Sequence, residues 1–208
     1  MLSGILAVPP TTGTFDFLFS WYLTSAIIAG GFVIGLILFF TVKYRAKPGS
    51  PPATKGPESL WVVVAVVAVM ALVLGAAGYQ TFASSTNIEV PHTSNSVTIL
   101  VTGFQWGWNF TYPNGRFDVG NLTVPAGRVV ILNVTSRDVY HTFGISMLAV
   151  KEDAIPGKIN QLWFEVPQPG FFLDAIRCYE LCGLGHAFMM ANLTAVSQSS
   201  WSAWMSSE

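Results

Sequence analysis

Two long apolar runs near the N-terminus constrain this chain more than any other feature of its sequence. Residues 15–42 contain a single charge, Asp16, at their beginning, and residues 60–79 contain none. A helix of about 20 apolar residues spans the hydrocarbon core of a bilayer. A buried helix of a soluble protein rarely stays apolar on every side over such a length. The sequence therefore predicts two transmembrane helices, at residues 15–42 and 58–82.

The segment between the two runs predicts the orientation of the chain. Residues 43–57 hold four of the ten basic residues, Lys43, Arg45, Lys47 and Lys55. Short basic loops stay in the cytoplasm. The first helix therefore begins, and the second helix ends, on the outer side of the membrane. We expect a multi-pass protein of the plasma membrane or another energy-transducing membrane. Residues 1–14 and 83–208 are then extracytoplasmic, and no cleaved signal peptide is evident because the first residues lack a basic region.

The overall composition excludes several classes of soluble protein. Charged residues make up 10% of the chain and hydrophobic residues 51%, whereas soluble proteins carry about 25% charged residues. A net charge of −1 excludes the broad basic surface that binds nucleic acid. We therefore expect membrane lipid, and no nucleic acid, among the partners.

Residues 83–208 have the pattern of an all-β domain. Short runs rich in Val, Thr and aromatic residues alternate with turns that contain Gly, Pro or Asn. The expected strands are residues 97–112, 117–124, 129–136, 161–166, 171–177 and 190–196. Regular short strands with such turns favour a sandwich or barrel. Four Asn-x-Thr sequons fit glycosylation of an exported domain, although Thr is also common in strands; they begin at Asn109, Asn121, Asn133 and Asn192.

One short segment gathers most of the metal-ligating side chains. Residues 178–189 read Cys-Tyr-Glu-Leu-Cys-Gly-Leu-Gly-His-Ala-Phe-Met and include both cysteines of the chain. Two thiols on the oxidising side of a membrane form a disulfide or bind a metal. A disulfide leaves His186 and Met189 without a role. Zinc bound by both cysteines, His186 and His141 is a common ligand set, but it gives no role to Met189.

Copper accounts for the whole set of residues. Thiolate, imidazole and thioether groups together select copper over hard cations. A mononuclear blue copper site uses one Cys, two His and a weak axial Met, so here the second thiolate is in excess. Two thiolates can instead bridge two copper ions, each with one terminal imidazole. Met189 and a backbone carbonyl between the cysteines remain as weak ligands, and sharing one electron over two metals suits fast electron transfer.

This arrangement resembles subunit II of cytochrome c oxidase, which carries the CuA centre. The family motif is Cys-x-Glu-x-Cys-x-x-x-His-x-x-Met, and a Ser-x-Asp-Val-x-His segment lies upstream. The positions that match are Cys178, Glu180, Cys182, His186 and Met189 in the motif, and Ser136, Asp138, Val139 and His141 upstream. The resemblance covers nearly the whole chain. It implies two N-terminal transmembrane α-helices followed by an all-β cupredoxin-like Greek-key barrel.

The resemblance also implies the role of each ligand. The two cysteines bridge both ions of a binuclear CuA centre. His141 and Met189 complete one copper, and His186 with the main-chain carbonyl of Glu180 completes the other. The Glu180 side chain is expected at a magnesium site shared with subunit I. No catalytic residue is expected in this chain, because oxygen is reduced in subunit I.

Three further residues match functional positions of the family. Trp106 aligns with the tryptophan that receives the electron from the donor, with simple packing as the alternative, whereas Trp108 and Phe110 are interpreted as packing residues. Glu58 aligns with a glutamate at the cytoplasmic mouth of a proton channel into subunit I. The helix dipole also favours a glutamate at a helix N-terminus, so both interpretations stay open. Asp138 aligns with a donor-docking position.

Some positions depart from the family pattern or lie outside it. Tyr179 replaces a serine, Gly107 an aromatic residue and Ala187 a small polar residue. None of these changes removes a ligand, and they are expected to tune the site through its surroundings. His92 lies outside the motif and is interpreted as a surface histidine of the linker.

Charge on the outer domain bears on the electron donor. Residues 83–208 hold nine acidic and six basic residues, with no acidic run. Many relatives attract a basic cytochrome c with acidic residues around the copper site. The hypothesis here is a donor that is not a strongly basic cytochrome, such as another copper protein or a membrane-held cytochrome.

The expected function is that of subunit II of a respiratory haem-copper terminal oxidase. This oxidoreductase subunit accepts electrons from cytochrome c or another copper protein and passes them to haem in subunit I, where oxygen is reduced to water. Subunit I and other oxidase subunits are the expected partners. The alternatives are the copper subunit of a nitric oxide reductase, a membrane-anchored copper-delivery protein and a structural zinc domain.

Overall fold

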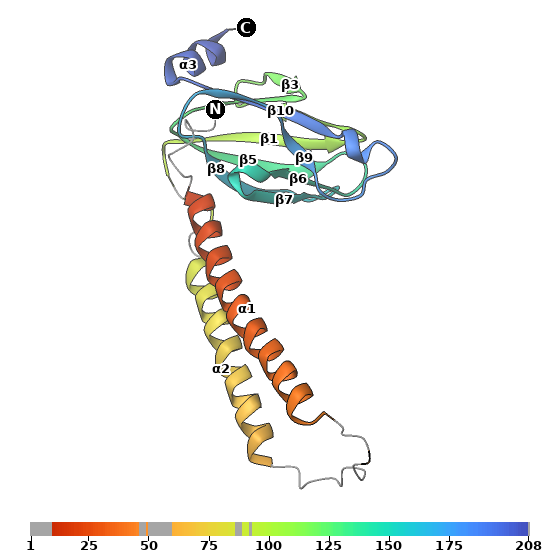
Figure 1. Cartoon of the computed structure of the whole chain (residues 1–208). Helices are drawn as coiled ribbons and strands as arrows, with labels where there is room; N and C mark the ends of the chain where they lie inside the picture. The colour runs from red at the N-terminus through yellow and green to blue at the C-terminus, as the bar shows by residue number, and fades with distance from the viewer. Residues whose placement is uncertain (1–9, 46–48, 50–59, 86–88, 92, 208) are drawn as a thin grey trace. The chain divides into compact units, whose positions relative to one another are not determined.

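The computed structural model describes residues 10–45, 49, 60–85, 89–91 and 93–207. The chain divides into a helical unit, residues 16–86, and a second unit that holds the β domain, residues 87–208, together with the segment that ends at Phe15. Two long helices, α1 (Pro10–Lys43) and α2 (Leu60–Ser85), make up the helical unit (Figure 1). Both are apolar and long enough to cross a membrane, and no residue of the most apolar stretch of either helix is buried within the protein.

The helices are longer than the apolar runs that predict them. α1 begins at Pro10 rather than at residue 15, and α2 continues to Ser85 rather than ending at residue 82. Proline is favoured in the first turn of a helix, where its missing N–H leaves no hydrogen bond unmade. The 34 residues of α1 extend over about 50 Å. This length exceeds the ~30 Å of a hydrocarbon core, so α1 is longer than a membrane span requires.

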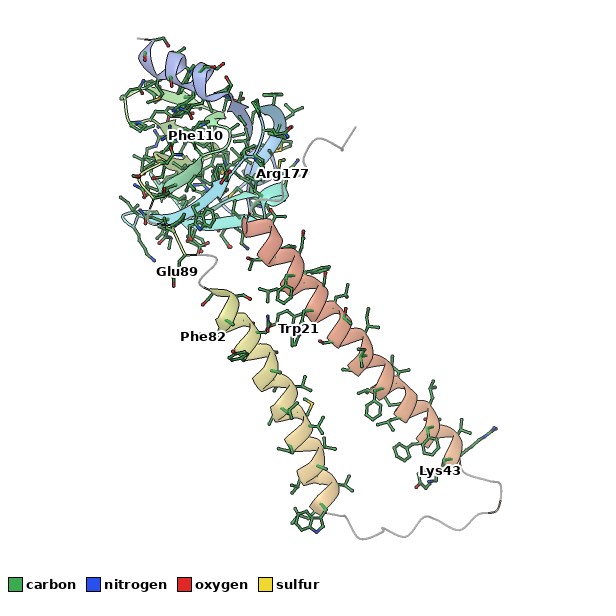
Figure 2. All side chains as sticks on the ribbon, turned by 90° about the vertical axis from the view of Figure 1, so that its left-hand side faces the viewer. Trp21, Lys43, Phe82, Glu89, Phe110 and Arg177 are labelled. Carbon is green, nitrogen blue, oxygen red and sulfur yellow. The ribbon has the colours of Figure 1, made fainter. Side chains whose placement is uncertain are left out.

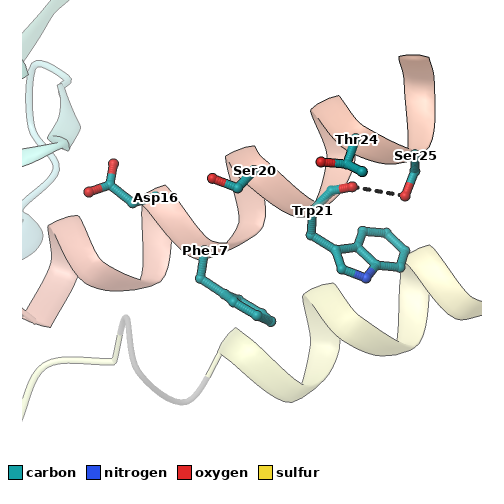
Figure 3. A pocket seen from close by; sticks show the side chains of 6 residues that line it. All are labelled: Asp16, Phe17, Ser20, Trp21, Thr24 and Ser25. Atoms are coloured by element: carbon teal, nitrogen blue, oxygen red, sulfur yellow. Dashed lines mark hydrogen bonds between the residues drawn. The ribbon is translucent and has the colours of Figure 1, made fainter. Parts of the chain in front are cut away.

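Aromatic and hydroxyl side chains join α1 to α2. The Tyr22 hydroxyl donates a hydrogen bond to the Ala77 carbonyl at 3.0 Å and also contacts the Thr81 hydroxyl. Trp21 projects from α1 towards α2 (Figures 2 and 3). The same part of α1 lines a shallow pocket of about 640 Å³ (Figure 3), formed by Asp16, Phe17, Ser20, Trp21, Thr24 and Ser25. An interhelical hydrogen bond in a membrane contributes about 0.6 kcal/mol, so these contacts stabilise the hairpin modestly.

The β unit is a sandwich of two five-stranded sheets. The first sheet has the order β3-β2-β1-β5-β8, with β1 (Ser96–Phe104), β2 (Gly107–Thr111), β3 (Phe117–Val119), β5 (Val129–Ser136) and β8 (Asn160–Glu165). The second has the order β4-β10-β9-β6-β7, with β4 (Asn121–Pro125), β6 (His141–Ile145), β7 (Val150–Ala154), β9 (Gly170–Cys178) and β10 (Met190–Val196). Apolar side chains of both sheets form one core, in which Ile99, Phe110, Leu132, Phe143 and Leu193 are fully buried.

Several strands differ from the expected bounds. The expected strand 97–112 is a hairpin instead, because the chain reverses at Gln105–Trp106 and Phe104 pairs with Gly107. The expected strand 117–124 divides at Gly120, whose φ of 78° favours glycine; the chain there leaves the first sheet for the second. Strands 129–136 and 190–196 have the predicted bounds.

Two strands and the helical turns were not predicted. All five positions of β6 are buried, so this strand lacks the alternation that marks a half-buried strand. β7 carries Lys, Glu and Asp in succession, which is unfavourable strand composition. Short 3₁₀ helices are η1 (Ser146–Leu148) and η2 (His186–Phe188), and the last helix is α3 (Gln198–Ser206).

The C-terminal helix packs on the sandwich through aromatic side chains. Ser197 caps α3 by accepting a hydrogen bond from the Ser200 backbone N–H at 3.2 Å. The Tyr112 ring lies 4.6 Å from the Trp204 ring, edge to face, and 6.1 Å from that of Trp201. Arg116 stacks on Trp204 and donates to its carbonyl at 2.8 Å. The two tail tryptophans therefore anchor the end of the chain on the sandwich.

Tyr112 should make stability depend on alkaline pH. Burial raises the pKa of Tyr112 to about 12, only partly offset by the hydrogen bond that its oxygen accepts from the Thr123 backbone N–H. Because the neutral phenol is favoured in the folded state, its contribution is complete below about pH 10 and is lost as pH rises towards 12. Tyr112→Phe should lower stability by about 1–3 kcal/mol at pH 7, since Thr123 N–H loses its acceptor.

Denaturant unfolding of the purified chain in detergent, followed by tryptophan fluorescence from pH 8 to 11.5, measures both effects. The difference between wild type and Tyr112→Phe should shrink above pH 10. A difference that stays constant with pH would show that Tyr112 titrates at its ordinary pKa in the folded protein.

Candidate metal centre

The predicted ligand residues come from neighbouring loops at one end of the sandwich. His141 begins β6 and Cys178 ends β9. Because these strands are antiparallel, with Phe143 opposite Cys178, the beginning of one lies beside the end of the other. The loop after β9 carries Glu180 and Cys182, and η2 with the residue after it supplies His186 and Met189 before β10 begins.

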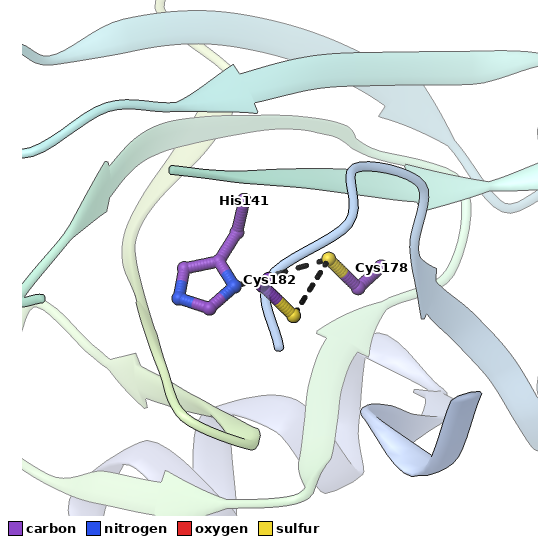
Figure 4. A group of neighbouring side chains, drawn as sticks. All are labelled: His141, Cys178 and Cys182. Atoms are coloured by element: carbon purple, nitrogen blue, oxygen red, sulfur yellow. Dashed lines mark hydrogen bonds between the residues drawn. The ribbon is translucent and has the colours of Figure 1, made fainter. Parts of the chain in front are cut away.

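The two cysteine sulfurs lie at the middle of the cluster. Their Sγ atoms are 3.8 Å apart (Figure 4) and both thiols are free and buried, so this arrangement is not a disulfide, whose S–S bond is about 2.05 Å. Two sulfurs that share a metal ion at about 2.3 Å must lie within about 4.6 Å of each other. The observed separation fits a pair of thiolates that share metal ions.

His141 directs one ring nitrogen at the cysteines and the other at a carboxylate. Its Nδ1 lies 3.9 Å from Cys178 Sγ and its Nε2 lies 2.8 Å from Asp138 Oδ1. The ring is completely buried. A hydrogen bond donated by Nε2–H leaves the lone pair of Nδ1 free, which is the usual way in which a carboxylate orients a metal-binding histidine. Gly103 makes room here, because a Cβ at that position would lie 3.1 Å from the His141 ring.

The remaining candidate ligands surround the same two sulfurs. His186 Nδ1 lies 3.5 Å and Met189 Sδ 3.7 Å from Cys182 Sγ. The Glu180 main-chain carbonyl lies 3.2 Å from Cys178 Sγ. The thioether of Met189 is buried, whereas the side chain of Glu180 is exposed. The chain thus brings two thiols, two imidazoles, one thioether and one carbonyl into a single cluster, which is a donor set suited to copper.

Burial also governs the protonation of the cluster. Burial, and after it the neighbouring Cys178, raise the pKa of the Cys182 thiol to about 11. Without metal, this thiol is therefore protonated at neutral pH. Since metals bind the thiolate, metal binding at Cys182 must displace a proton.

The β1–β2 turn is attached to the cluster through the main chain of Cys182. The Cys182 carbonyl accepts hydrogen bonds from Gln105 Nε2 at 2.6 Å and from Trp106 Nε1 at 3.3 Å. Trp106 is 43% exposed, whereas Trp108 is fully buried edge to face against Phe143. Trp108 therefore packs in the core, whereas Trp106 is exposed to solvent on one side and hydrogen-bonded to the Cys182 loop on the other.

Asp138 is partly exposed at the surface and also makes hydrogen bonds to residues of the cluster. Burial alone would raise the pKa of this carboxyl, but hydrogen bonds from His141 and from the backbone N–H groups of Gln105 and Val139 lower it to about 2. The two backbone bonds measure 2.7 Å each. The sequence comparison gave Asp138 only a docking role, and these contacts show that it also holds His141 and the β1–β2 turn.

Other sequence predictions have different outcomes. Glu58 and His92 lie outside the described residues. Tyr179, which departs from the family pattern, packs its ring over Gly144, where a Cβ would lie 2.6 Å from that ring. The Tyr179 hydroxyl contacts the Ser146 hydroxyl. Gln105 and Gly185, which contact Trp106 and the Cys182 loop, were not predicted, because their neighbours are distant in sequence and no local pattern marks them.

Comparison with known proteins places this site in a family. Residues 117–196 match the family described as "Cytochrome C oxidase subunit II, periplasmic domain". Over 211 residues, the chain is 30% identical to heme-copper oxidase subunit 2 of Aeropyrum pernix, in an alignment that covers 92% of this chain and 88% of that protein. The chain belongs to the cytochrome c oxidase subunit II family.

Two further relatives of this subunit II chain support its fold and its class. It is 34% identical to cytochrome c oxidase subunit 2 of Alkalihalophilus pseudofirmus over 83% of its length, and the alignment spans about half, 53%, of that protein. The solved periplasmic domain of subunit II of cytochrome oxidase of Bradyrhizobium japonicum matches 56% of the chain and 94% of that domain, with 32% identity and a TM-score of 0.51. The predicted fold, two long apolar helices followed by a cupredoxin-like β domain, is confirmed, as is membership of an oxidoreductase complex.

Proposed function

We propose that this subunit II accepts electrons one at a time from an external donor, at a binuclear copper centre, and passes them to haem in subunit I, where oxygen is reduced to water. The observation that carries this function is the cluster itself. Two unbonded sulfurs 3.8 Å apart are surrounded by two imidazoles, a thioether and a carbonyl. A binuclear site uses each of these groups, whereas a disulfide would use the two sulfurs alone.

The spread of the ligands favours two ions over one zinc ion. Among the described residues, the metal-binding group whose ligand atoms all lie within 4.8 Å of one another is His141, Cys178 and Cys182. His186 is not part of that group, although its Nδ1 lies 3.5 Å from Cys182 Sγ. A single tetrahedral zinc ion would need all four residues close together. The two histidines do not fall within one such group, which supports their assignment as terminal ligands of two different ions.

The chain's own residues prepare the site for fast electron transfer. Copper shared by two thiolates supplies a one-electron acceptor whose bond lengths change little on reduction. The burial of four of the ligands, with Asp138 holding His141, would keep the donor atoms in one geometry in both oxidation states; these four are His141, Cys178, Cys182 and Met189. Trp106 lies between solvent and the Cys182 carbonyl, which supports its assignment as the residue that receives the electron.

The partners follow from this function. Subunit I receives the electrons, the Glu180 side chain shares a magnesium site with it, and Glu58 lies at the mouth of its proton channel. α1 and α2 cross the plasma membrane or another energy-transducing membrane as a multi-pass anchor, with residues 83–208 outside. These roles rest on the family resemblance and on the exposure of Glu180.

The surface near the cluster supports a donor without a strongly basic face. The loop after β9 exposes Leu181, Leu184 and Phe188 by 78%, 98% and 78%, and no acidic run lies in the outer domain. A donor that docks through apolar contacts associates at a rate that depends weakly on salt. Stopped-flow reduction by the native donor at increasing ionic strength tests this, and a steep fall in the association rate would contradict it.

The metal and haem content of the complex, isolated from native membranes in mild detergent, tests the function as a whole. Two copper ions per chain, with co-purifying haem, would support it. The haem type then separates oxygen from nitric oxide as the acceptor. Copper without haem would favour an electron carrier or copper-delivery protein, and zinc without copper would overturn the proposal.

Replacing Met189 by leucine tests its assignment as a ligand. Leucine preserves the buried volume but removes the thioether 3.7 Å from Cys182 Sγ, so both coppers should remain while the reduction potential shifts and turnover slows. Copper analysis, EPR and redox titration measure these effects. Met190→Leu is the matched control, because it makes the same change at the next residue. If only Met190→Leu changes the spectrum, Met190 is the ligand.

A further inference from the structure

The Trp106 indole lies against the main chain at two glycines, Gly183 and Gly185. A Cβ added to Gly185 would lie 2.3 Å from Cδ2 and 2.6 Å from Cγ of the Trp106 ring. A Cβ added to Gly183 would lie 3.4 Å from Cζ2 and Nε1 of the same ring. Real Cβ atoms do not approach a ring as closely as 2.3 Å. Any side chain at Gly185 must therefore displace the indole.

Gly185 is not required by the backbone conformation. Its φ is −89° and its ψ is 6°, a combination that residues other than glycine also adopt. Gly183 differs, because its φ of 119° disfavours residues with a side chain. The absence of a side chain at Gly185 is thus explained by the contact with Trp106 and not by a turn.

The contact completes a route from solvent to the ligands. The half-exposed indole rests on Gly185, next to His186, and its Nε1–H points to the Cys182 carbonyl at 3.3 Å. Gln105 Nε2 donates to the same carbonyl at 2.6 Å. The shortest path from the ring to a cysteine sulfur then crosses one hydrogen bond and the atoms of Cys182 itself.

We propose that Gly185 is a positioning residue for electron transfer: it lets the Trp106 indole lie flat on the loop that carries Cys182 and His186, while Gln105 holds that loop to the β1–β2 turn. The inference rests on the proposed role of Trp106. The step oxidises the external donor by one electron and reduces the centre held by the six ligands by one electron, with no bond formed or broken.

Gly185→Ala in the assembled, copper-loaded complex tests the inference. The probe is reduced cytochrome c or a reduced small blue copper protein, whichever reduces the wild-type centre faster in stopped flow. Displacing the indole should slow this reduction at least about ten-fold, since misplacing a group by 1 Å can cost up to about 100-fold. Copper content, EPR spectrum and reduction potential should not change, because all six ligands remain.

Two comparisons separate the inference from the role of Trp106. If Gly185 acts through the indole, Gly185→Ala should add nothing to Trp106→Phe in a double-mutant cycle. Wild-type rates in Trp106→Phe would overturn the role of Trp106 itself. A slow Trp106→Phe with a fast Gly185→Ala, or effects that simply add, would overturn the positioning role alone. A changed EPR spectrum in Gly185→Ala would show that it acts through the ligands, and would also overturn it.

Two other variants complete the design. Gly170→Ala is the matched control, because Gly170 begins β9, at the far end of that strand from Cys178, and a Cβ there would meet the Phe172 ring rather than Trp106. It should behave as wild type. Gln105→Met preserves side-chain length but removes the hydrogen bond to the Cys182 carbonyl. It should slow electron transfer even if Gly185→Ala does not fold, and a wild-type rate would contradict the inference.

Discussion

Replacing Cys182 by serine should abolish the copper centre and reduce donor-driven electron transfer by more than about 100-fold. Its sulfur is the atom on which the cluster converges, 3.8 Å from Cys178 Sγ, 3.5 Å from His186 Nδ1 and 3.7 Å from Met189 Sδ. A hydroxyl is a hard, protonated group that does not replace a soft bridging thiolate. Because losing a group that only orients a ligand already costs about 10–100-fold in metal affinity, losing a bridging ligand should cost more.

Copper analysis and EPR of the purified complex measure this effect, and circular dichroism checks that the β domain is folded. Tyr179→Ser is the matched control: it introduces the same side chain beside Cys178 and leaves both cysteines in place. It should keep both coppers. If Cys182→Ser retained two coppers per chain with an unchanged spectrum, the two sulfurs would not bridge, and the binuclear assignment would be wrong.

Local patterns were sufficient to predict those parts of the fold that repeat along the chain. β5 alternates buried and partly exposed residues at every position, so residues 129–136 are visible as a strand in the sequence. β6 is buried at all five positions and gives no such signal, although it carries His141. The hairpin at Gln105–Trp106 was also missed, because the apolar pattern continues through a reversal that only the pairing of β1 with β2 reveals.

The candidate site shows the same division. The spacing of Cys178, Cys182, His186 and Met189 is local, so these candidate ligands could be recognised in the sequence. The contacts of Gln105 and Trp106 with Cys182 join residues 77 and 76 positions apart. No periodicity reports such contacts, and a glycine such as Gly185 gives no sign of what lies above it. Chemistry that depends on ligand identity is therefore readable from sequence, and the positioning of the surrounding groups is not.

Asp138 can be tested for two different roles, docking of the donor and positioning of His141. The two roles predict opposite effects of substitution on copper affinity. Its Oδ1 accepts from His141 Nε2 and Val139 N–H, and its Oδ2 accepts from Gln105 N–H, all within 2.8 Å. In Asp138→Asn, the amide NH₂ must face one of these donors. In Asp138→Glu, the extra methylene moves the carboxylate off all three. Both variants should therefore lower copper affinity about 10–100-fold.

Competition with a copper chelator measures the affinity, and stopped-flow reduction at several salt concentrations measures docking. If Asp138 acted only as a docking charge, Asp138→Glu would behave as wild type. Asp138→Asn would then slow donor association and weaken its salt dependence, with copper affinity unchanged. Asp118→Asn on β3 controls for the change in net charge. We expect the copper affinity, and not the salt dependence, to separate Asp138→Asn from this control, because the carboxylate orients a buried imidazole before any donor arrives.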